Sequence, residues 1–228
     1  MSTLTSAIEQ LLFAARTGDA AGVRALIESD PGLALACDED GETALAAAAA
    51  HGESEICGIL TAAGAEVDIH VASSLGLADE IQNMLWDDPE LVRARDGFRR
   101  ATPLYFAAEQ NRKAAAAVLL DFGADPNAEA ASGDTPVHAA AAAPAFRAME
   151  VLLDRGGAVN ARNHRRQTPL HRAVEERWGE ATEVIGLLLA AGADVNARDA
   201  NRETALSRAL DRNKTHIVEV LRKAGARE

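Results

Sequence analysis

A period of 33 residues runs through the chain and limits what it can fold into. The tripeptide Thr-Pro-Leu, or a close variant of it, begins at Thr102, Thr135 and Thr168, which are 33 residues apart, and again at Thr204 after 36. A second marker, in which leucines precede a glycine, keeps the same register. Such self-similarity is the signature of repeat proteins, whose units pack only against their neighbours.

Each period predicts the same local structure. A Thr hydroxyl can cap the free N–H groups of a helix, and Pro is preset for the first helical turn. Leu and small Ala residues follow, then a polar break, then a second apolar stretch that ends at a Gly suited to a left-handed cap. The composition is alanine-rich with only 4% aromatic residues, which favours closely packed helices. One helix pair cannot bury its own apolar face, so the units must stack.

The segment Thr168-Pro169-Leu170-His171-Arg172-Ala173 resembles the T-P-L-H-x-A mark of the ankyrin-repeat family, and residues 135–140 match it nearly as well. The resemblance covers essentially the whole chain. It implies an all-α solenoid of stacked helix-turn-helix units with short hairpin-like fingers, forming a single domain from 1 to 228. The seven expected units are residues 5–37, 38–69, 70–95, 96–128, 129–161, 162–197 and 198–228.

Several units depart from the common pattern. Unit 1 lacks Thr-Pro and has Ser6 and Glu9 in capping-box spacing, as expected of an atypical terminal repeat. Unit 3 is shortened at its front, and units 1 and 3 both follow their second helix with Asp-Pro. Unit 6 carries three additional residues within 175–182.

The charge of the chain limits its partners. There are 23 basic and 35 acidic residues, a formal net charge of −12. Residues 1–95 contain 4 basic and 17 acidic side chains, a charge of −13, and residues 96–228 contribute +1. Nucleic-acid and anionic-membrane surfaces need a basic field, so the composition argues against both as general partners.

The two cysteines, Cys37 and Cys57, lack CxxC spacing and are expected to be free thiols. The first residues have no basic region, and their apolar stretch is broken by Glu9 and Arg16, so no secretory signal is expected. No run approaches the roughly 18 apolar residues of a membrane span. We expect a soluble, monomeric, cytoplasmic protein.

The motifs give no sign of catalysis. Nucleotide-binding, nucleophile-elbow, HExxH and EF-hand patterns are absent from the sequence. The resemblance gives His138 and His171 a structural role as hydrogen-bonding residues between neighbouring units, and the other histidines lie in different units, so no metal site and no cofactor are expected. Adjacent carboxylates such as Glu175 and Glu176 diverge by about 100° on a helix. We therefore expect no enzyme activity.

Repeat arrays offer an extended concave surface, which in the ankyrin family usually binds another protein through fingers and first helices. We predict such a protein-binding module with a basic lip and an acidic wall. The alternatives are an anionic ligand or RNA held by the arginine-bearing fingers, and an unrecognised enzyme. The expected partner-binding residues are Phe98, Arg99, Arg100, Glu109, Gln110, His164, Arg165, Arg166, Gln167, Glu175, Glu176, Trp178, Asn201, Arg202, Asp211 and Arg212.

Two features of this surface have open interpretations. The position two before the Thr is Gly41 and Gly133 in two units but Arg100, Arg166 and Arg202 in three others. If the turn keeps a positive φ, each Arg costs on the order of 1 kcal/mol relative to Gly, which indicates either a use or evolutionary drift. Trp178 either packs over the lengthened turn of unit 6 or stands at the rim as a binding anchor.

Overall fold

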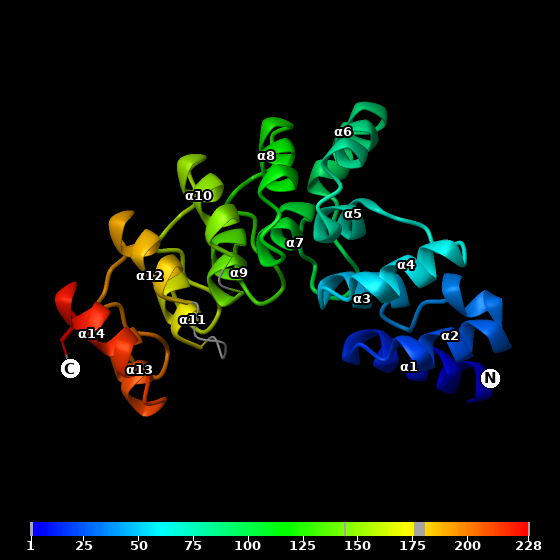
Figure 1. Ribbon diagram of the computed structural model, residues 1–228. Coiled ribbons are helices and arrows are strands. Elements are labelled where there is room, and N and C mark those ends of the chain that lie inside the picture. Colours follow the sequence, from blue (N-terminus) through cyan, green and yellow to red (C-terminus); the bar gives the residue numbers. More distant parts are fainter. Residues whose placement is uncertain (1, 144, 176–180, 228) are drawn as a thin grey trace.

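The computed structural model describes residues 2–143, 145–175 and 181–227. Over these residues the chain forms fourteen α-helices and no named strand. The helices follow one another in pairs along an arch, with the two termini at its opposite ends (Figure 1). The all-α solenoid expected from the repeats is therefore confirmed.

The first helix of each pair packs against the first helix of the next pair. These helices are α1 (Ser2–Thr17), α3 (Ala44–Ala50), α5 (Ile69–Leu75), α7 (Pro103–Glu109), α9 (Pro136–Ala142), α11 (Pro169–Glu175) and α13 (Ala205–Asp211). The second helices are α2 (Ala20–Ser29), α4 (Ser54–Ala62), α6 (Ala78–Asp87), α8 (Lys113–Asp121), α10 (Phe146–Asp154), α12 (Ala181–Ala190) and α14 (Thr215–Lys223).

Threonines stand at the N-caps of α3, α7, α9 and α13 as predicted, but not all of them cap the helix with their hydroxyl. The hydroxyl oxygen of Thr43 accepts a hydrogen bond from the Ala46 N–H at 3.1 Å, and Thr204 accepts one from the Ser207 N–H at 3.1 Å. Thr102 makes no side-chain cap, and its buried hydroxyl has no hydrogen-bond partner among the described residues. In this unit Tyr105 stands where the next two units have His, and Pro103 at the first position suits the helix start without a cap.

The expected capping box of unit 1 is wrong. Helix α1 begins at Ser2, so Ser6 lies inside the helix rather than at its N-cap. Its hydroxyl instead accepts a hydrogen bond from the Gln10 side chain at 3.4 Å. The helix extends further toward the N-terminus because residues 2–5 carry neither Gly nor Pro to stop it.

The two Asp-Pro segments form matching 3-10 helices, η1 (Pro31–Leu35) and η2 (Pro89–Arg93). Asp30 and Asp88 cap them, each accepting a backbone N–H at 3.0 and 3.1 Å respectively. The shared sequence feature of units 1 and 3 thus has a shared structure.

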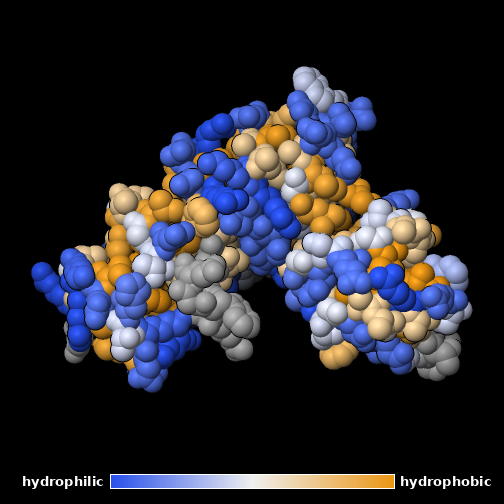
Figure 2. Space-filling model, in the orientation of Figure 1, coloured by the Kyte–Doolittle hydropathy of each residue, from blue (hydrophilic) through white to orange (hydrophobic). Residues whose placement is uncertain are grey.

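The apolar core consists of two clusters of buried side chains that meet in α5. Val71 belongs to the cluster of the N-terminal units, whereas Ile69 and Ala72 belong to the cluster of the remaining units. Helices α2 and α4 pack together, as do α6 and α8, but α4 and α6 do not pack closely, and Figure 1 shows them diverging. In Figure 2, hydrophobic residues form strips between hydrophilic surfaces, with a broader area beside α5 and α6. Units 2 and 3 therefore contact each other mainly through their first helices, α3 and α5.

Candidate functional site

Short loops precede the first helices, and we call them fingers: residues 38–42, 95–101, 129–134, 162–167 and 198–203. In every finger except residues 129–134, an Asp or Asn near the start shapes the loop by accepting backbone N–H groups, as turn-forming residues do. The Asp199 carboxylate accepts from Asn201 at 2.8 Å and from Glu203 at 2.9 Å. The Asn163 side chain accepts from Arg165 at 3.0 Å and from Gln167 at 2.9 Å. The fingers are thus closed locally by their own sequence.

Backbone hydrogen bonds also join neighbouring fingers. The N–H of Ala131 donates to the carbonyl of Arg99 at 2.8 Å, and the N–H of His164 donates to Ser132 at 3.1 Å. The N–H of Ala200 donates to Arg165 at 2.9 Å. Four successive fingers therefore form one row whose spacing is fixed before any partner arrives.

The arginines that replace Gly at the finger turns adopt the left-handed conformation expected for this position. The φ angles are 51° at Arg100, 57° at Arg166 and 66° at Arg202. Each position costs on the order of 1 kcal/mol relative to Gly, and the side chains are exposed. Unit 5 keeps Gly133 for a second reason, because a Cβ there would lie 2.7 Å from the ring of His164.

The two histidines of the repeat motif connect neighbouring units, which confirms their predicted structural role. His138 accepts the backbone N–H of Thr135 at 3.1 Å through Nδ1, and its Nε2 lies 3.0 Å from the carbonyl of Gln167 in the next unit. His171 repeats this arrangement, with Nε2 3.1 Å from the carbonyl of Glu203. Burial lowers the pKa of both imidazoles, and this effect is larger than the rise in pKa caused by the acceptor carbonyls. The neutral form of each ring is therefore preferred.

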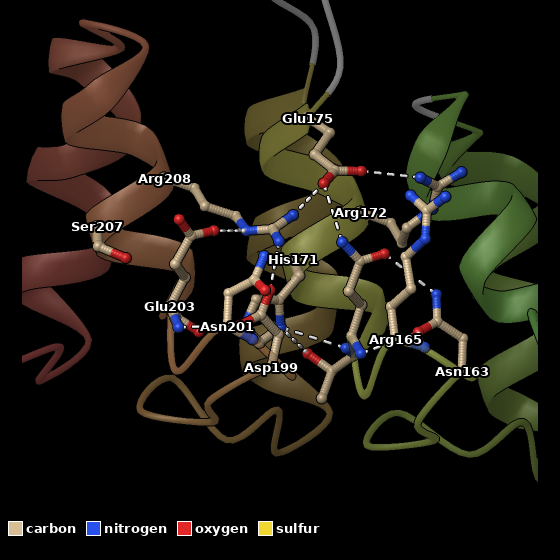
Figure 3. A network of polar contacts seen from close by, with 12 residues as sticks. Asn163, Arg165, His171, Arg172, Glu175, Asp199, Asn201, Glu203, Ser207 and Arg208 are labelled. Carbon is tan, nitrogen blue, oxygen red and sulfur yellow. Dashed lines mark hydrogen bonds and ion pairs between the residues drawn. The ribbon is translucent and has the colours of Figure 1, made fainter.

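A network of charged side chains crosses the inner helices of units 6 and 7 (Figure 3). Arg208 is only 6% exposed, and its guanidinium contacts Glu175 and Asp199 directly and Glu203 at 3.2 Å. Glu175 also accepts from Arg172 at 2.8 Å. Burial raises the pKa of Asp199, but the backbone N–H bonds and Arg208 outweigh it, and the pKa lies below its usual value. The carboxylates and guanidinium groups of this network therefore compensate one another.

A smaller pair of charges lies on unit 4. Arg99 donates to both oxygens of Glu109, at 2.9 and 2.7 Å, and its guanidinium lies 5.7 Å from the centroid of the Phe106 ring. Burial lowers the pKa of Arg99, but the charge of Glu109 outweighs it and the pKa is raised. The basic lip and the acidic wall expected for the groove thus neutralise each other here.

The predicted site residues that the structure describes divide into three groups. Gln167 is buried and donates to Glu175 at 3.1 Å, so its expected place at an open fingertip is wrong. Glu176 and Trp178 lie outside the described residues. The half-buried ones are Arg99, Glu109, Gln110 and Glu175, and the exposed ones are Phe98, Arg100, His164, Arg165, Arg166, Asn201, Arg202, Asp211 and Arg212.

Sequence reasoning missed the basic side chains of the inner network. Arg172 and Arg208 both stand four residues after the repeat Thr, where units 4 and 5 have Phe106 and Ala139. A carboxylate recurs three residues further on in units 4, 6 and 7. Residues at i and i+3 lie on the same face of a helix, so this spacing could have predicted an ion pair between the arginine and the carboxylate.

Among the described residues, no group of three or more His, Cys, Asp or Glu side chains could hold a metal ion. Over the same part of the chain, no helix combines the length and apolar character needed to cross a membrane.

Comparison with known proteins agrees with the helix pairs and fingers. A family model described as ankyrin repeats (3 copies) matches residues 69–163, 104–199 and 147–227. No curated protein matches the chain.

Proposed function

Because the chain belongs to the ankyrin-repeat family, whose repeats are generally protein–protein interaction modules, we propose that it is a non-catalytic protein that binds another protein on its concave finger and first-helix surface. The exposed ends of the hydrogen-bonded finger row carry this proposal. They present Phe98, which is 57% exposed, and the exposed arginines Arg165 and Arg202. Aromatic and arginine side chains are the commonest binding anchors.

The fixed spacing of the fingers favours binding at low entropic cost. A surface that is ordered before association loses less conformational freedom when the partner binds. The bonds from Ala131 to Arg99 and from Ala200 to Arg165 supply that order in the free protein.

The pairing of the inner charges favours a protein over a nucleic acid. Arg99, Arg172 and Arg208 are each engaged by carboxylates, so they do not form an uncompensated basic field. Nucleic-acid binding draws its affinity from such a field. The exposed Arg100, Arg166 and Arg202 remain the basis of the alternative, an anionic ligand or RNA.

We further infer that each helix pair is one repeat unit of a single domain spanning residues 1–228, and that the protein is a cytoplasmic monomer. The two cysteines are free thiols, which supports a reducing compartment.

The test uses charge-reversed variants of the full chain. Three immobilised proteins are used to capture proteins from a lysate of the source organism, with and without nuclease. They are the wild type, the finger variant Arg165→Glu/Arg202→Glu, and the control Arg147→Glu/Arg155→Glu, whose substitutions lie on helix α10 and at its C-terminal end. A protein retained by wild type and control but lost from the finger variant supports the proposal. Retention by all three chains overturns the finger surface, and loss on nuclease treatment favours the RNA alternative.

A further inference from the structure

Arginines occur in pairs in three of the fingers. These fingers have one arginine at the first position and another at the left-handed turn, and the pairs are Arg95 with Arg100, Arg162 with Arg166, and Arg198 with Arg202. The two fingers that keep glycine at the turn, at Gly41 and Gly133, have no arginine at the first position. The two positions therefore change together, and we call the three combinations the arginine pairs.

The first arginine of each pair is held against the backbone of a finger. Arg95 donates to the carbonyl of Arg100 at 2.7 Å, and Arg198 donates to the carbonyl of Arg202 at 2.8 Å. Arg162 reaches the next finger, where it donates to the carbonyl of Arg198 at 3.1 Å. A guanidinium has five N–H donors, so these bonds fix the position of the group and leave other donors for a ligand.

The arginine pairs keep their positive charge. All six side chains are exposed, and within the part of the chain that the structure describes none of them forms an ion pair with a carboxylate. The acidic side chains of the same fingers are turned to other donors. Asp96 accepts the backbone N–H of Arg99 at 2.7 Å, and Asp199 and Glu203 contact Arg208. In the fingers of units 4 to 7 only Glu129 is an exposed carboxylate.

Both positions of a pair are unfavourable in the free protein. The turn arginines have φ angles of 51°, 57° and 66°, a region that residues with a Cβ disfavour. The first arginine adds a second positive charge to the same short loop, and like charges repel each other. Backbone strain of this kind is concentrated at ligand sites. A bound anion relieves the repulsion, so the pairs indicate a ligand rather than a contribution to stability.

We propose that the arginine pairs bind an acidic segment of the partner protein, with aspartate or glutamate side chains about three residues apart. The planar guanidinium matches a carboxylate with two parallel hydrogen bonds. Stacked units lie about 8–10 Å apart, and an extended chain of the polyproline II type returns to the same side every three residues, after about 9 Å. This inference rests on the proposed function and names the chemistry of the partner.

The charges of the chain favour a short acidic segment over RNA. A polynucleotide carries a negative charge at every phosphate, so it meets the exposed carboxylate of Glu129 between the pairs of units 4 and 6. Beyond unit 4 it meets residues 1–95, whose formal charge is −13. An acidic segment of a protein has uncharged residues between its carboxylates and avoids both repulsions.

The test is a titration of the full chain with the peptide acetyl-(Glu-Gly-Ser)4-amide, which carries a neutral dye, followed by fluorescence anisotropy at low salt. A second peptide has Lys in place of Glu, and a uridine pentanucleotide with four phosphates represents RNA. The finger variant is Arg162→Gln/Arg198→Gln. The matched control is Arg147→Gln/Arg155→Gln, which has the same net charge and removes two exposed arginines outside the fingers.

We expect Arg162→Gln/Arg198→Gln to weaken binding of the glutamate peptide about tenfold, and the control to change it by less than about twofold. Circular dichroism of each variant verifies the fold. Three results overturn the inference: equal weakening by the two variants, equal binding of the glutamate and lysine peptides, or no binding of the glutamate peptide. Tighter binding of the pentanucleotide than of the glutamate peptide, with the same dependence on the arginines, also overturns it and assigns the pairs to RNA.

The proposed function is tested separately on the captured protein partner. If that partner is lost from Arg165→Glu/Arg202→Glu but binds Arg162→Gln/Arg198→Gln as tightly as wild type and is not displaced by the glutamate peptide, the inference about the arginine pairs is wrong and the proposed function stands. If the glutamate peptide behaves as expected and no protein partner depends on the fingers, the arginine pairs stand as a site and the proposed function fails.

Discussion

Removing the guanidinium of Arg208 is expected to cost more stability than removing any exposed ion pair of this chain. The substitution Arg208→Met keeps the apolar stem and leaves Asp199, which is 4% exposed, with a buried and uncompensated negative charge. Breaking a buried ion pair by removing one partner costs about 3–5 kcal/mol. Because Glu175 and Glu203 lose the same partner, we expect a cost within that range.

The measurement is urea denaturation followed by circular dichroism, combined with hydrogen exchange of the amides in α11 and α13. Hydrogen exchange is needed because repeat arrays can open locally, and the loss must appear in units 6 and 7. The matched control is Arg155→Met, which removes an exposed pair with Asp121 at 2.7 Å and is expected to cost less than about 1 kcal/mol.

A second variant separates the charge from the packing. In Arg208→Met/Asp199→Asn the new amide oxygen still accepts the finger N–H groups, and the buried charge is gone, so a substantial part of the stability should return. Two outcomes would refute the claim that Arg208 compensates the buried charge of Asp199. One is an equal loss of unfolding free energy in Arg208→Met and Arg155→Met, and the other is a double variant that is no more stable than Arg208→Met.

Three further outcomes are expected. Burial lowers the pKa of His138 and His171, so below about pH 6.5 the unfolded chain binds protons that the folded chain does not. The free energy of unfolding should therefore fall between pH 7 and pH 5, by at most about 1.4 kcal/mol per pH unit for each imidazole. A free energy of unfolding that stays constant over this range would contradict the buried neutral form. Arg202→Gly should be more stable than Arg202→Ala by about 1 kcal/mol in denaturation, since only Gly avoids the Cβ cost at φ 66°, and equal stability would mean that the turn is unstrained. Burial raises the pKa of the Cys57 thiol to about 11, so iodoacetamide at pH 8 should label exposed Cys37 and leave Cys57 unreacted until the chain unfolds; equal labelling would show that the N-terminal core is open.

The repeat period predicted the fold because its signals act locally. Thr before Pro, Leu with Ala, and Gly after the second helix each determine their own turn or cap, so the helices follow from neighbouring residues alone. The exception at Thr102 shows the limit. The hydrogen bonding of the Thr hydroxyl depends on the residue three positions later. His171 provides a ring nitrogen for the Thr168 hydroxyl, whereas Tyr105 leaves the Thr102 hydroxyl without a partner among the described residues.

The candidate site was less predictable because its contacts join residues about 30 positions apart. Arg208, for example, contacts Glu175, 33 residues earlier in the preceding unit. Gln167 was predicted at a fingertip, but hydrogen bonds with Asn163 and Glu175 of its own unit hold its side chain in the interior. The contact between units 4 and 2 depends on the missing finger of unit 3. A deletion in unit 3 is visible in the sequence, but the approach of Gly97 to Asp40 follows only from how the arch closes over the gap.

The distribution of charges follows from the stacking itself. Inner helices lie roughly 8–10 Å apart, so a long charged side chain on one helix reaches the next helix. Partial burial makes an unpaired charge costly there, and pairing such as that of Glu175 with Arg208 is favoured. Fingertips project beyond this spacing into water, where the charge on Arg165 or Arg202 can stay unpaired at little cost. Recognition by charge is therefore left to the finger ends, where the stacked helices do not supply a partner.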